Sequence, residues 1–344
     1  MVPDPIAGLV RELLVRQVAE WAPGALHRGR RATVVYAYGG PDTGTVGSVL
    51  RVFTGLAEPL RGRRLAVVVL AAQPGDPGLA ADQSGLPAEV SLYAVPGAPD
   101  RLGVVLKAAG AAGAPVLALL DASDGPTPSP ATFAALAAGR PAELLLILGD
   151  RSRAGSDHRR TLPEAGFDLV SEVELVTEPD PGAEREAGAE REAGAEPDPG
   201  AAPGRAGGAD SAGVPGRGSR LVVFGTSSGK RLEAFKDGIW ALGHGTGVRY
   251  RDPYGPGPSV DVPPTAPDPL GSRLLTRLAT GGPATVSELR LFTVTRTVYR
   301  AEDANRALTG LLAAGLVSRE PATGRLGGDV LVEAVGPVPD PAVG

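Results

Sequence analysis

The chain has 344 residues, of which 42% are hydrophobic, so it is long enough for more than one domain and apolar enough to bury a core. It contains no cysteine and only three histidines, which excludes disulfides and thiolate metal sites and argues against a histidine-rich metal site. The net charge of −5 argues against nucleic-acid binding by the protein surface as a whole. The sequence has no long apolar run and no signal-like N-terminus, which predicts a cytoplasmic protein without a membrane segment.

The first 177 residues alternate between helical and extended patterns. Short, continuously apolar strands such as LAVVVLAA and AELLLILG are typical of a parallel sheet covered on both faces, with the intervening helices as crossovers. We therefore predict a Rossmann-like, doubly wound α/β sheet over residues 1–177. The expected elements are helix 9–21, strand 33–38, helix 47–60, strand 64–71, strand 90–95, helix 101–112, strand 115–120, helix 130–138 and strand 142–148.

Residues 178–219 form a low-complexity segment that contains EPDPGA twice and no Leu, Ile or aromatic residue. Such a segment cannot bury enough apolar surface to offset the entropy of ordering, so we predict a disordered insertion. FDLVSEVELV before it and RLVVFG after it both have strand character. Because the cost of loop closure grows slowly with length, these strands can share one sheet, which residues 220–254 would complete with a last strand and helix.

The C-terminal part begins after a Pro/Gly-rich linker at residues 255–269. Three helical patterns at 270–279, 286–292 and 301–314 precede a hairpin pattern over 316–334, an order that predicts a winged helix-turn-helix over 270–334 and a disordered tail over 335–344. Residues 268–334 carry eight arginines and seven acids, so the region is nearly neutral. Since phosphate contacts dominate non-specific DNA affinity, this balance favours a protein-interaction or dimerisation module and predicts only weak nucleic-acid binding.

The stretch VVYAYGGPDTGTVGSVLRVF, residues 34–53, is a strand, a glycine-rich turn and a helix. In an α/β sheet such a turn lies where a nucleotide-like cofactor binds, and Gly39, Gly40 and Gly44 would let the backbone approach a ligand. Gln73 follows the second strand, where such folds usually place a carboxylate on the ribose hydroxyls. Asp121 stands at the end of the strand VLALLD.

The order of these motifs resembles the three-Cys-motif partner (TcmP) family, whose members resemble class I methyltransferases and carry a C-terminal winged helix. YAYGGPDTGTVGSVL resembles that family's first strand and turn, VLALLDASDG its strand ending in aspartate, and RLVVFGTSSGKRLEAFKDGIWAL its late strand and lysine–aspartate–alanine–methionine–tryptophan helix. If the site is retained, the resemblance implies S-adenosylmethionine as the cofactor, held at Gly39, Gly40, Gly44 and Gln73, with Asp121 at the substrate. It also implies a protein partner.

Several positions depart from the family pattern. Tyr36 replaces the acid of the first strand, residues 71–73 (Ala-Ala-Gln) supply no carboxylate, and Ala122 and Ser123 stand where the family has proline and an aromatic residue. An aromatic residue there would stack on an extruded base in base-modifying enzymes. These departures favour a diverged, non-catalytic partner or scaffold protein, with an active S-adenosylmethionine-dependent methyltransferase and a winged-helix nucleic-acid-binding regulator as alternatives.

Other motifs allow further interpretations. GTSSG, residues 225–229, matches a nucleophile elbow between strand and helix, but a hydrolase built on Ser227 would have to use His244 as its base. His158 belongs to the basic stretch RSRAGSDHRR, which we expect to be a solvated loop. Trp21 and Trp240 lie in helical patterns and are expected to anchor the core.

Overall fold

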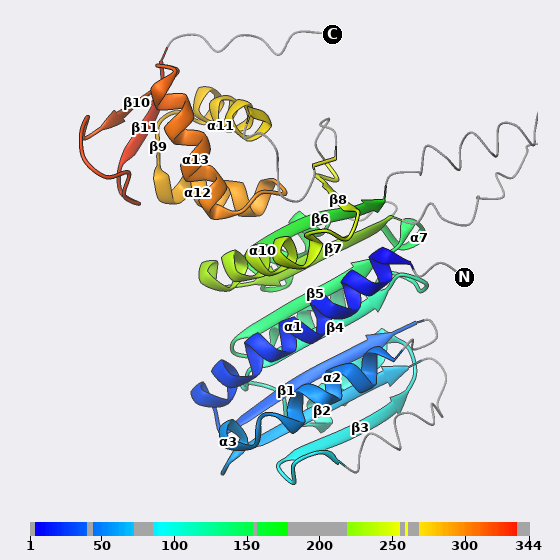
Figure 1. Cartoon of the computed structure of the whole chain (residues 1–344). Helices are drawn as coiled ribbons and strands as arrows, with labels where there is room; N and C mark the ends of the chain where they lie inside the picture. Colours follow the sequence, from blue (N-terminus) through cyan, green and yellow to red (C-terminus); the bar gives the residue numbers. More distant parts are fainter. Residues whose placement is uncertain are drawn as a thin grey trace, which may run out of the picture.

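The computed structural model describes residues 4–39, 44–71, 85–153, 157–177, 219–254, 259–260 and 268–335. Its central unit is an eight-stranded sheet in the order β3-β2-β1-β4-β5-β7-β6-β8 (Figure 1). The first five strands pair in parallel, whereas β7 is antiparallel to both of its neighbours and β8 is antiparallel to β6. The strands are β1 Arg31–Tyr38, β2 Arg64–Ala71, β3 Val90–Pro96, β4 Val116–Ala122, β5 Ala142–Leu148, β6 Leu169–Thr177, β7 Arg220–Thr226 and β8 Val248–Arg251.

Helices cover both faces of this sheet. Side chains alternate along each strand, so Val34 and Tyr36 of β1 belong to one apolar core and Val35 and Ala37 to the other. Helices α1 (Pro5–Arg28), α2 (Thr45–Thr54) and α10 (Gly229–Gly243) cover the first face, and α5 (Leu102–Ala108), α6 (Pro130–Ala137) and α8 (His158–Ala165) cover the second. The predicted α/β class, with a large and mostly parallel sheet between helices, is confirmed.

Three predicted helices have different bounds in the structure. The first helix begins earlier, because Asp4 caps it by accepting the N–H of Ile6 and Pro5 suits its first turn. The helix predicted over 47–60 is two helices, α2 and α3 (Ala57–Leu60), because α2 ends at Gly55. The helix predicted over 101–112 is the short 3-10 turn η2 (Pro99–Arg101) followed by α5, and a left-handed Gly110 follows its end.

Strands β6 and β7 are antiparallel neighbours, with Leu175 opposite Arg220. The expectation that the two strands around the low-complexity segment share one sheet is therefore confirmed. Residues 178–218 themselves lie outside the described residues. Helices α7 (Asp150–Arg153) and α8 and strand β8 were not predicted from the sequence.

We call residues 268–335 the C-terminal module. It contains three helices and a three-stranded antiparallel sheet in the order β10-β11-β9 (Figure 1). The three helices and the hairpin expected in this region are present. The elements are α11 Asp268–Gly281, β9 Ala284–Thr285, α12 Val286–Arg296, α13 Ala301–Ala313, β10 Val317–Glu320 and β11 Leu331–Ala334. None of the helices among the described residues is long and apolar enough to cross a membrane.

Candidate functional site

The carboxyl edge of β1 and β4 is the place where the strand order of the sheet reverses. Ligands of open α/β sheets bind in the crevice outside such an edge. At this edge, Tyr38 of β1 is paired with Ala71 of β2 on one side and with Asp121 of β4 on the other. Asp121 is paired in turn with Ile147 of β5. Tyr38 and Ile147 belong to the core on the α1 and α2 face, so the side chain of Asp121 between them is directed to that same face.

The backbone closes this edge directly beside Gly39. The N–H of Gly39 donates to the carbonyl oxygen of Asp121 at 3.2 Å, which extends the contact between β1 and β4 by one residue. A Cβ atom on Gly39 would lie only 3.2 Å from the Cα atom of Gly125. The loop after β4 therefore packs its backbone against Gly39, at the start of the turn where the sequence predicts a cofactor.

The carboxylate of Asp121 has a local structural role. Its Oδ1 atom accepts the backbone N–H of Ser123 at 3.0 Å, which stabilises the turn after β4. Tyr36, which replaces the acid of the family pattern, is buried, and its ring stacks on Tyr38 with centroids 5.1 Å apart. A packed aromatic side chain thus occupies the position where the family pattern has a carboxylate.

Gly44 is required by the turn that begins α2. It caps the helix with φ 86° and ψ 13°, in the left-handed region, and its carbonyl accepts the N–H and the hydroxyl of Ser48. The structure thus brings Gly39 and Asp121 together and places Gly44 at the start of the adjoining helix. Gly40 and Gln73 lie outside the described residues, so their assignment stays a prediction.

No protein-family model and no curated protein matches the chain. The resemblance to the three-Cys-motif partner family therefore rests on the motifs alone. Within the described residues, no group of three or more His, Cys, Asp or Glu side chains could hold a metal ion.

The hydrolase interpretation of GTSSG is wrong. Ser227 precedes α10 and His244 follows it, so the two residues lie at opposite ends of a 15-residue helix. A helix of that length spans about 22 Å at ~1.5 Å per residue, far beyond hydrogen-bond reach.

A group of charges lies where the C-terminal module meets the edge of the large sheet, with Glu172 buried and the others partly buried. We call Arg159, Glu172, Asp252 and Arg273 the seam charges. Arg159 lies 2.9 Å from Glu172 and 3.5 Å from Asp252, and Asp252 also pairs with Arg273 of α11. Tyr254 donates its hydroxyl to Glu172 at 3.3 Å and lies under the Arg159 guanidinium, and burial is the main cause that raises the pKa of Tyr254 to about 12.

His158 is not in a solvated loop. It begins α8, which Asp157 caps, and its side chain is buried, edge-on to Phe133 and 3.6 Å from Glu172. The prediction failed because the basic residues around it suggested solvent exposure, whereas Arg159 pairs with a carboxylate under the helix. The acids in SEVELV were a usable signal, since charges that alternate with apolar residues in a covered strand require buried partners.

Two side chains of α10 hold the turn between α12 and α13. Lys236 donates from Nζ to the carbonyl of Thr297 at 2.7 Å, and Trp240 donates from Nε1 to the carbonyl of Val298 at 2.9 Å. The exposed fraction of Lys236 is 0%, and burial lowers the pKa of its amine to about 7, against the opposing attraction of Asp252. The expectation that Trp21 and Trp240 anchor the core is confirmed by their burial.

The start of α13 is partly buried as well. Ala301 and Asp303 are only 5% and 3% exposed, and Arg300 lies over the ring of Trp240. Arg300 pairs with Glu302 at 2.7 Å and with Asp303 at 3.2 Å, and Arg306 also pairs with Asp303. Arg300, which precedes α13, and Arg306 within it therefore both pair with acids of its first turn.

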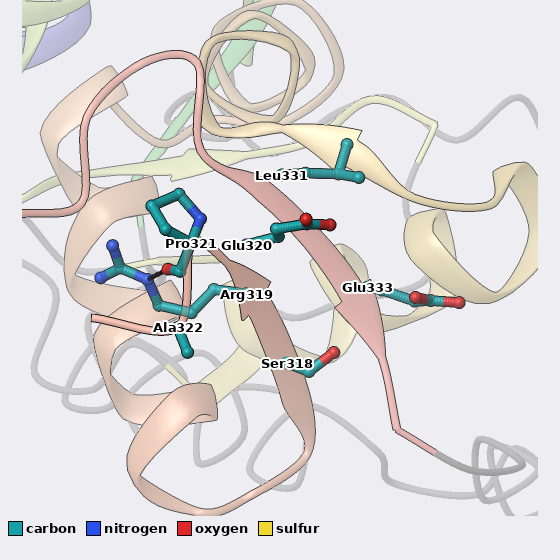
Figure 2. A pocket seen from close by; sticks show the side chains of 7 residues that line it. All are labelled: Ser318, Arg319, Glu320, Pro321, Ala322, Leu331 and Glu333. Atoms are coloured by element: carbon teal, nitrogen blue, oxygen red, sulfur yellow. Dashed lines mark hydrogen bonds between the residues drawn. The ribbon is translucent and has the colours of Figure 1, made fainter. Parts of the chain in front are cut away.

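A shallow pocket of about 500 Å³ lies on the hairpin of β10 and β11 (Figure 2). Its only cationic side chain is Arg319, whose guanidinium donates to the carbonyls of Pro321 and Gly324 in the turn of the hairpin. Since Arg319 stabilises the turn, the pocket presents little that would recognise an anion. Its lining residues are Ser318, Arg319, Glu320, Pro321, Ala322, Leu331 and Glu333.

Proposed function

We propose that the chain is a non-catalytic, methyltransferase-like scaffold of the three-Cys-motif partner type, which acts by binding another protein. The strand order β3-β2-β1-β4-β5 supports a Rossmann-like origin, because it reproduces the order of a dinucleotide-binding sheet. The observation that carries the proposal is the contact between Gly39 and Gly125 at the point where this order reverses.

The side chains at this edge support the same conclusion. A cofactor with ribose hydroxyls and a charged amino-acid end needs hydrogen-bond partners when it leaves water. Ala71 has no polar side-chain atom and the ring of Tyr36 packs in the core, so neither position supplies the carboxylate of the family pattern. Each missing charge-assisted bond weakens binding by roughly 1.5–3 kcal/mol, so two such losses move a micromolar site towards millimolar affinity.

The element order of the C-terminal module fits a winged helix, which we propose serves as a protein-binding unit. In a DNA-binding helix-turn-helix, the N-terminal residues of the recognition helix contact the bases. Here α13 would be that helix: Ala301 and Asp303 of its first turn are buried, Arg300 before it lies over the ring of Trp240, and Arg300 and Arg306 pair with acids. Both features favour protein contact over DNA contact.

Calorimetry tests the absence of a cofactor site. The full chain is titrated with S-adenosylmethionine and with S-adenosylhomocysteine, and no binding is expected at micromolar concentrations. Low-micromolar binding that is lost in Gly40→Val would contradict the proposal and establish the methyltransferase alternative, with Asp121→Asn as the next variant to assay for turnover.

Fluorescence anisotropy with a labelled random duplex tests the role of the module. We expect weak binding by the full chain at physiological salt and a steep further loss as salt is added. Tight binding that survives added salt, and that Arg306→Ala abolishes, would favour the nucleic-acid-binding regulator instead.

A further inference from the structure

We propose that Lys236 is an acid-sensitive latch, which holds the C-terminal module on the large sheet when its amine is neutral and loosens the module when the amine is protonated. The proposal concerns the seam between the two units and does not depend on whether the sheet binds a cofactor.

The latch is built from consecutive contacts on one short turn. Lys236 and Trp240 are one helical turn apart on α10, and they hold the adjacent carbonyls of Thr297 and Val298. The ring of Tyr299 also stacks on Trp240, with centroids 6.3 Å apart. One face of α10 thus binds the turn between α12 and α13, next to the ion pairs Arg290–Glu233 and Arg273–Asp252 that also join the module to the sheet unit.

The charges around Lys236 do not provide it with a carboxylate of its own. Glu172 of β6 pairs with Arg159 of α8, and Asp252, which follows β8, pairs with Arg159 and with Arg273 of α11. Among the described residues, no carboxylate lies within ion-pair distance of Nζ, whose hydrogen bond goes to a neutral carbonyl. A buried ammonium without a paired carboxylate is unfavourable, so this geometry favours the neutral amine.

The direction of the pH effect follows from the difference between the pKa of Lys236 in the docked state and its pKa in the released state. The pKa of Lys236 is about 7 in the docked state, against 10.5 for an exposed lysine, so the docked form binds fewer protons than the released form between these values. Docking therefore weakens as the pH falls from 10.5 towards 7 and is weakest below 7. For these two pKa values the docking equilibrium falls about ninety-fold from pH 9 to pH 6.

The absence of native cysteine makes a single-thiol reporter of opening straightforward. Val298→Cys places a thiol at the seam, and Ala118→Cys places one in the sheet core, both at nearly fully buried positions. Labelling rates, corrected for the reactivity of an exposed thiol at each pH, report opening at each site. We expect position 298 to label faster than position 118 and its opening to rise about ninety-fold from pH 9 to pH 6.

Lys236→Met in the Val298→Cys background is the matched variant. Methionine keeps the length and removes the titrating amine, while His158 and the seam charges remain, so any pH dependence that those groups cause persists in it. We expect the opening at position 298 to become nearly independent of pH. The latch is refuted if the variant keeps the pH dependence of the parent, or if positions 298 and 118 open at the same rate.

A second measurement needs no substitution and stays decisive if Lys236→Met does not fold. The chain contains only three lysines, Lys107, Lys230 and Lys236, and the first two are exposed. Carbon-13 labelling of the lysine ε-carbons gives three signals in the full chain. We expect one signal to titrate near pH 7, apart from the two exposed references, and titration of all three together in the alkaline range would overturn the proposal.

Discussion

Removal of one partner from the buried ion pair between Glu143 and Arg231 should destabilise the large sheet strongly. Arg231, in the first turn of α10, places Nε 3.0 Å and 3.1 Å from the two carboxylate oxygens of Glu143 on β5. Gln17 of α1 donates to the same carboxylate at 3.3 Å. The three side chains therefore connect β5 to the two helices that cover it.

The magnitude follows from burial. Glu143 is only 2% exposed, so Arg231→Met leaves a buried carboxylate with the neutral amide of Gln17 and without its arginine. Loss of one partner of such a pair costs about 3–5 kcal/mol, whereas replacement of both partners by apolar residues is often neutral. We therefore expect a large loss of stability in Arg231→Met and recovery of most of it in Glu143→Met/Arg231→Met.

Urea unfolding followed by tryptophan fluorescence measures these changes. The matched control is Arg61→Met, which removes the same side chain from an exposed pair with Glu58, at 2.7 Å and about 80% exposure. Exposed pairs contribute little, so the control should unfold at the parent's urea concentration. An Arg231→Met variant no less stable than Arg61→Met would refute the reasoning.

Three further predictions concern local geometry and the seam. Gly44→Ala should destabilise the chain by roughly 1–2 kcal/mol because residue 44 has a positive φ. Its control, Gly8→Ala inside α1, should raise the melting temperature, and equal shifts of the two variants in thermal unfolding would contradict this. Trp240→Phe should cost about 1–3 kcal/mol in urea unfolding by leaving the Val298 carbonyl without its donor, and Trp21→Phe is the control for the loss of an indole. Hydrogen bonds from Thr285 lower the pKa of Glu288. The carboxylate should therefore stabilise the fold fully above pH ~4.5, and this stabilisation should vanish as the pH falls through the lowered pKa. In thermal unfolding, Glu288→Gln should then be as stable as the parent at acid pH and less stable at neutral pH.

Much of the large sheet could be predicted because its strands are short apolar runs and its crossovers have helical periodicity. The strand from Thr33 to Tyr38 and the strand ending near Asp121 were found within a few residues of their observed bounds. The end of α2 at Gly55 was missed because apolar residues continue at helical spacing beyond it. Strand β8 was missed because its four residues alternate valine and tyrosine with arginine, a pattern equally common in loops.

The seam was harder to predict, because its partners lie far apart in the sequence. Lys236 could have been found from periodicity alone: Leu232, Phe235, Ile239 and Trp240 define a buried arc of α10, and position 236 falls inside it. A lysine on such an arc must be either neutral or paired. What the sequence could not supply was the acceptor, since Thr297 lies 61 residues away.

The polar contacts at the carboxyl edge and at the seam support the two proposals in different ways. At the carboxyl edge, the backbone N–H of Gly39 donates to the carbonyl of Asp121, and the backbone N–H of Ser123 donates to the Asp121 carboxylate. At the seam, a lysine and a tryptophan bind carbonyls of another unit, beside charges that neutralise each other. Chemistry requires polar groups that face a ligand, whereas these groups fix the relation between two parts of one protein. This distribution supports the proposed scaffold and the proposed release of its module.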